Sequence, residues 1–141
     1  MKKILFCCLL IISSFIAFAQ SADEKAIQKL MQKQALAWNN GNIDEFMKGY
    51  WQNDSLMFIG HGGITYGYKN TLDNYKKNYD SKEKMGTLFF SDVKMKKLST
   101  DHYFIVGKWL LKRSGGDIGG YYTLLFRKIN GQWLIVCDHT S

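Results

Sequence analysis

The fold is decided by residues 118–141, IGGYYTLLFRKINGQWLIVCDHTS, in which two apolar runs flank the pair Asn130-Gly131. This pair is one of the strongest short hairpin signals, and it predicts antiparallel strands over 118–129 and 132–140. The second strand runs directly into four polar residues, Asp138 to Ser141. They could form the floor of a pocket, or they could close the end of a sheet by hydrogen bonding.

Two further strand-like runs precede this hairpin. They are GTLFFSDVKMKKL (86–98) and HYFIVGKWLLKR (102–113), and the turn-forming stretches STD and SGGD separate the four runs. An antiparallel meander of four strands is therefore predicted. A strand of twelve residues spans roughly 40 Å. Gly107, Gly119 and Gly120 lie inside these runs, and glycine allows strands to bend, so we expect a curved sheet with an open mouth.

The first half of the chain predicts helices. Ser21 and Glu24 form a capping box, apolar residues recur at helical spacing up to Trp38, and Gly41 supplies a stop. A second, shorter helix is expected after Asn42, a short strand over 54–60 and a third helix over 67–79. Helices followed by a meander indicate an α+β domain, with three N-terminal helices packed against a strongly curved antiparallel sheet in a cone-shaped fold.

Residues 1–19 have the pattern of a secretory signal peptide. Lys2 and Lys3 precede the apolar stretch ILFCCLLIISSFIAF, and Ala17-Phe18-Ala19 is a cleavage site of the small-x-small type. The apolar run is too short for a membrane span. We expect cleavage before Gln20, export to the periplasm or the medium, no membrane association afterwards, and one domain over residues 20–141.

Composition excludes some classes of function for the exported domain. Loss of Lys2 and Lys3 lowers the net charge from +7 to +5, and the remaining basic residues are scattered along the chain. This argues against nucleic-acid binding, which requires a basic groove interleaved with aromatic residues. Cys137 is the only cysteine of residues 20–141, so no internal disulfide is expected, and the three histidines lack metal-ligand spacing. We expect neither a metal nor an obligatory cofactor.

Three stretches together resemble the nuclear transport factor 2-like superfamily. They are ALAWNNGNIDEFMKGYWQNDSLMFIG (35–60), GITYGYKNTLDNY (63–75) and GQWLIVCDHTS (131–141). The most similar branch contains the SnoaL-like domains and small bacterial domains related to the calmodulin-kinase association domain. The resemblance covers residues 20–141 and implies the same cone-shaped fold. It implies no single function, because this superfamily contains enzymes and binding modules.

The two best-defined active-site patterns of the superfamily are not matched. The position implied for the base of steroid-isomerase-like relatives falls at Ile59, which cannot take a proton, and Asp54 is expected to cap the strand entry instead. Relatives that hydrolyse epoxides use an Asp-Arg-Asp group. The only arginines here are Arg113 and Arg127, and both are expected to face solvent.

The closing strand supplies the best candidate for an acid or base. Strict alternation places Leu134, Val136, Asp138 and Thr140 on one face, and Trp133, Ile135, Cys137 and His139 on the other. The resemblance to the association domain implies that Thr140 faces the pocket, so Asp138 should do so as well. His139 should then lie on the outer face, where this superfamily commonly forms dimers. A buried Asp138 would be a plausible acid or base, or it could seal the sheet end.

Candidate catalytic residues are Asp138, with His61 or Tyr122 as partners; His61 lies on the glycine-rich stretch GHGG (60–63). The aromatic residues predict a funnel that suits a flat or apolar ligand, or else a solid core. The residues expected to line it are Trp38, Tyr50, Phe58, Trp109, Tyr122, Leu124, Phe126, Val136, Asp138 and Thr140.

The sequence is compatible with three functions. The leading hypothesis is an exported domain, expected to be homodimeric, that binds an unidentified small organic ligand. The first alternative is a cofactor-free enzyme of the cyclase, isomerase or hydratase type that uses Asp138. The second is a domain for protein interaction or oligomerisation through the outer sheet face.

Overall fold

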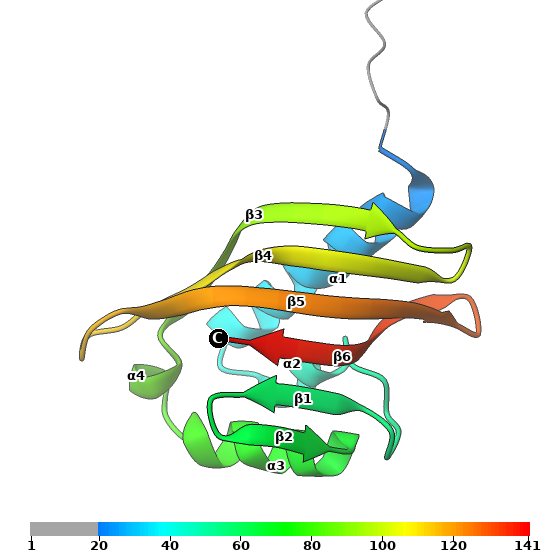
Figure 1. Ribbon diagram of the computed structural model, residues 1–141. Coiled ribbons are helices and arrows are strands. Elements are labelled where there is room, and N and C mark those ends of the chain that lie inside the picture. Colours follow the sequence, from blue (N-terminus) through cyan, green and yellow to red (C-terminus); the bar gives the residue numbers. More distant parts are fainter. Residues whose placement is uncertain (1–19) are drawn as a thin grey trace, which may run out of the picture.

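A computed structural model describes residues 20–141, so the predicted signal peptide lies outside the described residues. Four helices and six strands follow one another along the chain (Figure 1). The helices are α1 (Ala22–Asn39), α2 (Ile43–Met47), α3 (Tyr68–Asn78) and α4 (Lys82–Met85); the strands are β1 (Met57–Gly60), β2 (Gly63–Tyr66), β3 (Thr87–Lys97), β4 (His102–Lys112), β5 (Ile118–Ile129) and β6 (Gln132–Thr140). The predicted α+β class and the three longer helices are confirmed, and α4 is an additional single turn.

The helices begin where side-chain caps predict. The Ser21 Oγ accepts a hydrogen bond from the Glu24 backbone N–H, and the Glu24 carboxylate accepts one from the Ser21 N–H, which completes the capping box. At α2 the Asn42 Oδ1 accepts a hydrogen bond from the Glu45 N–H at 2.9 Å. Between the two helices Gly41 has a φ of +76°, a conformation that favours glycine.

The sheet has the strand order β2-β1-β6-β5-β4-β3, and the helices lie on one side of it (Figure 1). Neighbouring strands from β3 to β6 are antiparallel, as predicted. However, β1 pairs with β6 in parallel, so the sheet is mixed rather than wholly antiparallel. The strand β2 was not predicted; it returns from β1 through a turn over 60–63 and forms one edge of the sheet.

Two bulges interrupt the regular alternation of the long strands. In β6, Cys137 is opposite Leu125 but Ile135 is opposite Phe126, which leaves Val136 as the extra residue. In β3, the register shifts between Ser91 and Lys94. Each bulge reverses the direction in which the following side chains point, so the two halves of β6 do not obey a single alternation.

Two of the glycines predicted to bend strands are required for space. A Cβ at Gly107 would overlap the hydroxyl of Tyr122, which pairs with Gly107 across β4 and β5. A Cβ at Gly120 would overlap the backbone carbonyl of Ser141. Glycine at these positions therefore leaves space for the Tyr122 ring and for the backbone of the last residue.

The concave face of the sheet and the helices enclose the core. Ile27 of α1, Phe126 of β5 and Ile135 of β6 are at most 1% exposed. Tyr103 and Trp133 pack edge to face at 5.3 Å between ring centroids. None of the helices in residues 20–141 is long and apolar enough to cross a membrane.

Candidate functional site

A cavity of about 550 Å³ lies between the concave face of the sheet, the turn that joins β1 to β2, and α3. Aromatic side chains from several elements make up much of its wall. They are Trp38 of α1, Phe46 of α2, Tyr50 of the segment that follows, Phe58 of β1, Tyr75 of α3, Tyr79 directly after α3, Phe90 of β3, Trp109 of β4 and Tyr122 of β5. A wall of this kind suits a small, largely apolar molecule.

Asp138 of β6 is the only aspartate or glutamate among the residues that line this cavity, and it is 4% exposed. Its Oδ2 accepts a hydrogen bond from the Tyr50 hydroxyl at 2.7 Å, and its Oδ1 accepts one from the Thr140 Oγ1 at 2.8 Å. Asp138 is opposite Leu124 on β5 and pairs in parallel with Phe58 on β1. The carboxyl group is therefore fixed at the centre of the sheet by neighbours on both sides.

The environment of Asp138 disfavours its ionised form. Burial raises the pKa of Asp138 to about 6, although the hydrogen bonds from Tyr50 and Thr140 act in the opposite direction. Burial also holds the pKa of both Tyr50 and Tyr75 well above its usual value, and the negative charge of Asp138 adds to this effect. The tyrosines thus stay protonated as hydrogen-bond donors, and Asp138 is the group that titrates near neutrality.

Tyr122 supplies a second polar atom at the same place. Its side chain is 3% exposed, and its hydroxyl is the one buried side-chain polar atom of the described residues without a hydrogen-bond partner. Burial raises the pKa of Tyr122, and the negative charge of Asp138 raises it further. The Tyr122 ring packs edge to face on Phe90 at 5.4 Å and is opposite Thr140. A buried unpaired hydroxyl is costly, so this cavity has unused hydrogen-bonding capacity.

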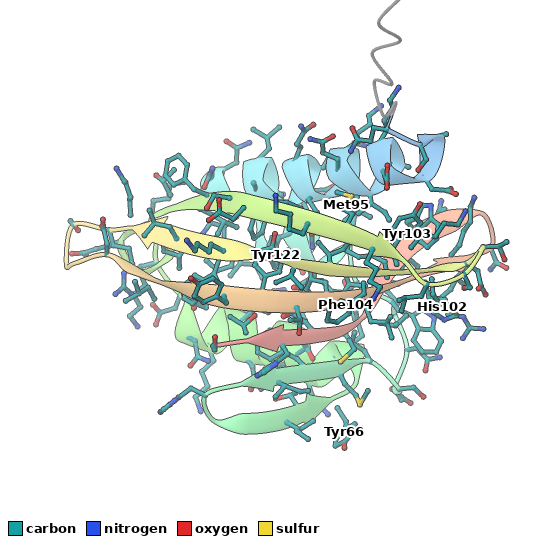
Figure 2. All side chains as sticks on the ribbon, turned by 45° about the horizontal axis from the view of Figure 1, so that its top comes forward. Tyr66, Met95, His102, Tyr103, Phe104 and Tyr122 are labelled. Atoms are coloured by element: carbon teal, nitrogen blue, oxygen red, sulfur yellow. The ribbon has the colours of Figure 1, made fainter. Side chains whose placement is uncertain are left out.

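The mouth of the cavity carries two groups that can be positively charged. His61, in the turn between β1 and β2, and Lys77 of α3 line the cavity and are exposed. His102 lies at the start of β4, away from Tyr122 (Figure 2), and its Nδ1 is 2.9 Å from the Asp101 carboxylate. Within residues 20–141, no three His, Cys, Asp or Glu side chains are close enough to hold a metal ion.

Most of the residues predicted to line a pocket do line this cavity: Trp38, Tyr50, Phe58, Trp109, Tyr122, Leu124, Asp138 and Thr140. The prediction is wrong for Phe126 and Val136. Phe126 is fully buried in the solid core, and Val136 is the extra residue of the β6 bulge. Because of that bulge, Trp133 and Ile135 are buried at 5% and 1% exposure although alternation placed them on the outer face with His139.

Sequence reasoning missed the contribution of α3 to the cavity. The sequence predicts a helix over 67–79 but assigns none of its residues to the pocket, yet Tyr75 and Tyr79 line the cavity, as do Phe46 of α2 and Phe90 of β3. The signal that could have identified Tyr75 is its place one helical turn from Tyr79 and Leu72 on a helix that is otherwise polar.

The residues at the positions of the family's known active-site patterns lie outside the cavity. Asp54 was expected to cap the entry to the first strand, but its side chain is exposed and forms no hydrogen bond within residues 20–141. Asn53 caps the turn before β1 instead, because its Oδ1 accepts a hydrogen bond from the Ser55 N–H at 2.9 Å. Ile59 of β1 pairs with His139 of β6 and does not line the cavity. Arg127 is exposed, whereas Arg113 is half-buried and its Nε donates to the Gly116 carbonyl.

Comparison with solved structures gives three informative matches. An NTF2-like protein of unknown function from Shewanella oneidensis MR-1 has 42% identity and a TM-score of 0.81, over 84% of this chain and 98% of that chain. A candidate calcium/calmodulin-dependent protein kinase II association domain from Xanthomonas campestris has 15% identity and a TM-score of 0.69, over 87% and 89%. Hexachlorocyclohexane dehydrochlorinase LinA-type3 from Novosphingobium barchaimii LL02 has 18% identity and a TM-score of 0.70, over 85% and 86%.

The last two similarities concern the fold alone. The chain matches no family model and no curated protein.

Proposed function

The chain belongs to the nuclear transport factor 2-like family, and from this premise we propose that its aromatic cavity binds a small organic molecule. The single observation that carries the proposal is the pair of buried polar groups inside a cavity of about 550 Å³, namely the carboxyl of Asp138 and the unpartnered hydroxyl of Tyr122. Natural cores pair such groups. A bound ligand with a polar group would complete the hydrogen bonding of this cavity.

The size and walls of the cavity support the same conclusion. Ligand sites for small molecules typically have volumes of roughly 300–1,000 Å³ and combine apolar walls with a few placed polar groups. Here the polar groups lie on β5 and β6, at the centre of the sheet, where the neighbouring strands hold them rigidly. Rigid placement lowers the entropy that a binding site loses when its ligand arrives.

Native mass spectrometry of protein purified from its own host tests this proposal. We expect an adduct of a small molecule on the wild-type chain. Leu124→Trp, which fills the cavity from β5, should abolish the adduct, and Thr123→Trp, on the opposite face of the same strand, should keep it. Absence of an adduct on the wild type, or its persistence in a folded Leu124→Trp variant, would contradict the proposal.

A second candidate function is an enzyme that needs no cofactor. The observation that favours it is the burial of Asp138 in the cavity wall, because burial raises the pKa of this carboxyl to about 6, close to the value that suits a general acid or base near neutrality. Asp138 would transfer the proton, and Tyr122 or His61 would polarise a carbonyl group. This reading requires that Asp138→Asn abolish turnover of the host ligand while the protein still binds it; unchanged turnover would exclude Asp138 as the acid or base.

The outer face of the sheet supports a further proposal, a homodimer. Phe104, Val106 and Leu110 of β4 and Leu125 of β5 are half-buried there, and Tyr121 is exposed. No helix of residues 20–141 covers this face (Figure 1). Light scattering should give a dimer that Val106→Glu converts to a monomer, and a wild-type monomer would remove the proposal.

Export also stays a proposal. Its test is the intact mass of protein recovered from the host, which should correspond to a chain that begins at Gln20.

A further inference from the structure

Within residues 20–141, the buried carboxylate of Asp138 has no cationic partner. The ion pairs of residues 20–141 all involve other, more exposed acidic groups. The two hydrogen bonds to Asp138 come from neutral hydroxyls, those of Tyr50 and Thr140. A buried anion without a counter-charge is costly. The cavity is therefore electrostatically incomplete on the side that Asp138 faces.

The walls around this carboxylate favour a positive charge. Aromatic rings carry negative charge on their faces and attract cations that lie over them. Tyr50, Phe58, Tyr75, Trp109 and Tyr122 all line the same cavity as Asp138. A cation there would be surrounded by rings on several sides, with one carboxylate as its direct partner.

The unpartnered hydroxyl of Tyr122 adds an acceptor. Tyr122 is opposite Thr140 on the neighbouring strand, and Thr140 donates to Asp138, so the three side chains lie on one face. A protonated amine has several N–H donors, which can be shared between the Asp138 carboxylate and the Tyr122 oxygen. A carboxylate ligand, in contrast, would be repelled by Asp138.

Resting on the proposed function, we propose that the polar group recognised in this cavity is a protonated amine carried on a flat, apolar body. The neighbouring groups that titrate or carry charge are few. Tyr75 of α3, Tyr79 directly after it and Tyr50 stay neutral, because burial raises the pKa of each. His61 and Lys77 lie at the mouth of the cavity, and His139 follows Asp138 on β6.

Three probes with one indole body test the proposal by calorimetry. Tryptamine carries an amine, 3-propylindole is its neutral analogue, and indole-3-propionate carries a carboxylate. At pH 7.5 we expect tryptamine to bind at least about tenfold more tightly than 3-propylindole. A close, desolvated ion pair between the amine and Asp138 is sufficient to produce a difference in affinity of this size. Indole-3-propionate should bind most weakly. Asp138→Asn should remove the preference for tryptamine, and Asp54→Asn, the same change at an exposed carboxyl, should keep it.

The pH dependence of tryptamine binding tests the role of the Asp138 carboxylate. Tryptamine stays protonated from pH 7.5 to pH 5, whereas Asp138, with its pKa of about 6, becomes largely neutral. The affinity of the wild type for tryptamine should therefore fall by about tenfold at pH 5. In Asp138→Asn the affinity should not change over this pH range.

Equal binding of tryptamine and 3-propylindole, or an unchanged preference in a folded Asp138→Asn variant, would overturn the amine proposal and leave the proposed function intact. Failure of all three probes at millimolar concentration would also overturn it. The proposed function is decided separately, by the adduct on the host-purified protein. Should Asp138→Asn fail to fold, Tyr122→Phe provides the second variant and should reduce the preference for tryptamine severalfold; an undiminished preference counts against the proposal.

Discussion

The two ends of the concave sheet face differ in how their buried polar groups are paired. The closed end, near the β5–β6 hairpin, comprises Ile27, Tyr103, Phe126 and Trp133; the open end comprises Tyr50, Tyr122, Leu124, Asp138 and Thr140. At the closed end the Tyr103 hydroxyl is 3.3 Å from the Ser21 Oγ, and the Trp133 Nε1 donates to the Asp23 carboxylate at 3.0 Å. At the open end the Tyr122 hydroxyl has no partner.

This difference arises from what lies opposite the strands, because β5 and β6 run through both ends. The first turn of α1 packs over the closed end and supplies Ser21 and Asp23 as partners. Over the open end, α3 and the β1–β2 turn leave a cavity instead of filling it. The closed end therefore stabilises the fold. The open end contributes less to stability, because its interior is a cavity that contains polar groups.

The largest predicted effect concerns apolar truncation at the two ends. Phe126→Ala at the closed end should lower the free energy of unfolding by about 4 kcal/mol, because it leaves a new void in a solid core. Leu124→Ala, two residues away at the open end, should cost about 2 kcal/mol, since its void merges with an existing cavity. Urea denaturation measures both. Equal costs would mean that the two ends are packed alike.

The second prediction concerns the pH dependence of stability at the open end. The pKa of Asp138 is about 6 in the folded protein, above that of an unfolded aspartate. The stabilisation from its bound proton is therefore complete below about pH 4 and is lost as the pH rises through 6. Relative to Asp138→Asn, the wild type should lose about 2 kcal/mol of unfolding free energy between pH 4 and pH 7.

Asp23, at the closed end, provides the control for this prediction. Its hydrogen bonds with Lys128 and Trp133 lower its pKa. Its effect on stability should therefore have the opposite sign, with stability gained as the pH rises. A pH-independent difference between the wild type and Asp138→Asn would show that Asp138 is well hydrated.

The third prediction tests how tightly Tyr122 is held. Gly107→Ala places a Cβ where the Tyr122 hydroxyl lies, so the ring must move. Overpacking of this kind should cost about 2 kcal/mol. Tyr122→Leu in the same chain should relieve most of that cost, which a double-mutant cycle measures. Additive effects of the two changes would mean that Gly107 and Tyr122 do not constrain each other.

The smallest predicted effect compares two tyrosine hydroxyls. Tyr122→Phe removes a buried hydroxyl without a partner, so it should leave stability unchanged or raise it by up to about 1 kcal/mol. Tyr103→Phe removes a hydroxyl that contacts Ser21, so it should lower stability by about 1 kcal/mol. Thermal unfolding of both variants decides this. The same sign for both changes would contradict the contrast between the two ends.

Local signals in the sequence were sufficient for most elements of the fold. The capping residues Ser21 and Asn42 mark real helix starts, and Asn130-Gly131 forms the predicted hairpin between β5 and β6. These features depend on neighbours within a few residues. The parallel pairing of β1 with β6 depends on residues about 80 positions apart, such as Met57 and Cys137, and no local pattern specifies it.

The candidate site could be predicted in part for the same reason. The resemblance implied that Thr140 faces the pocket, alternation placed Asp138 on the same face, and both residues line the cavity in the structure. Alternation also placed Val136 there, because a bulge leaves no signal in a run of apolar residues. The walls from α3 depend on how that helix lies against the sheet, which the periodicity of Tyr75 and Tyr79 does not specify.

The pKa of Asp138, measured by NMR titration of its carboxyl carbon, tests most directly whether the open end is a cavity built around one buried carboxylate. The account predicts a value of about 6. Addition of tryptamine should lower the value, and addition of 3-propylindole should not. An Asp138 that titrates near 4, like an ordinary aspartate, would contradict the account.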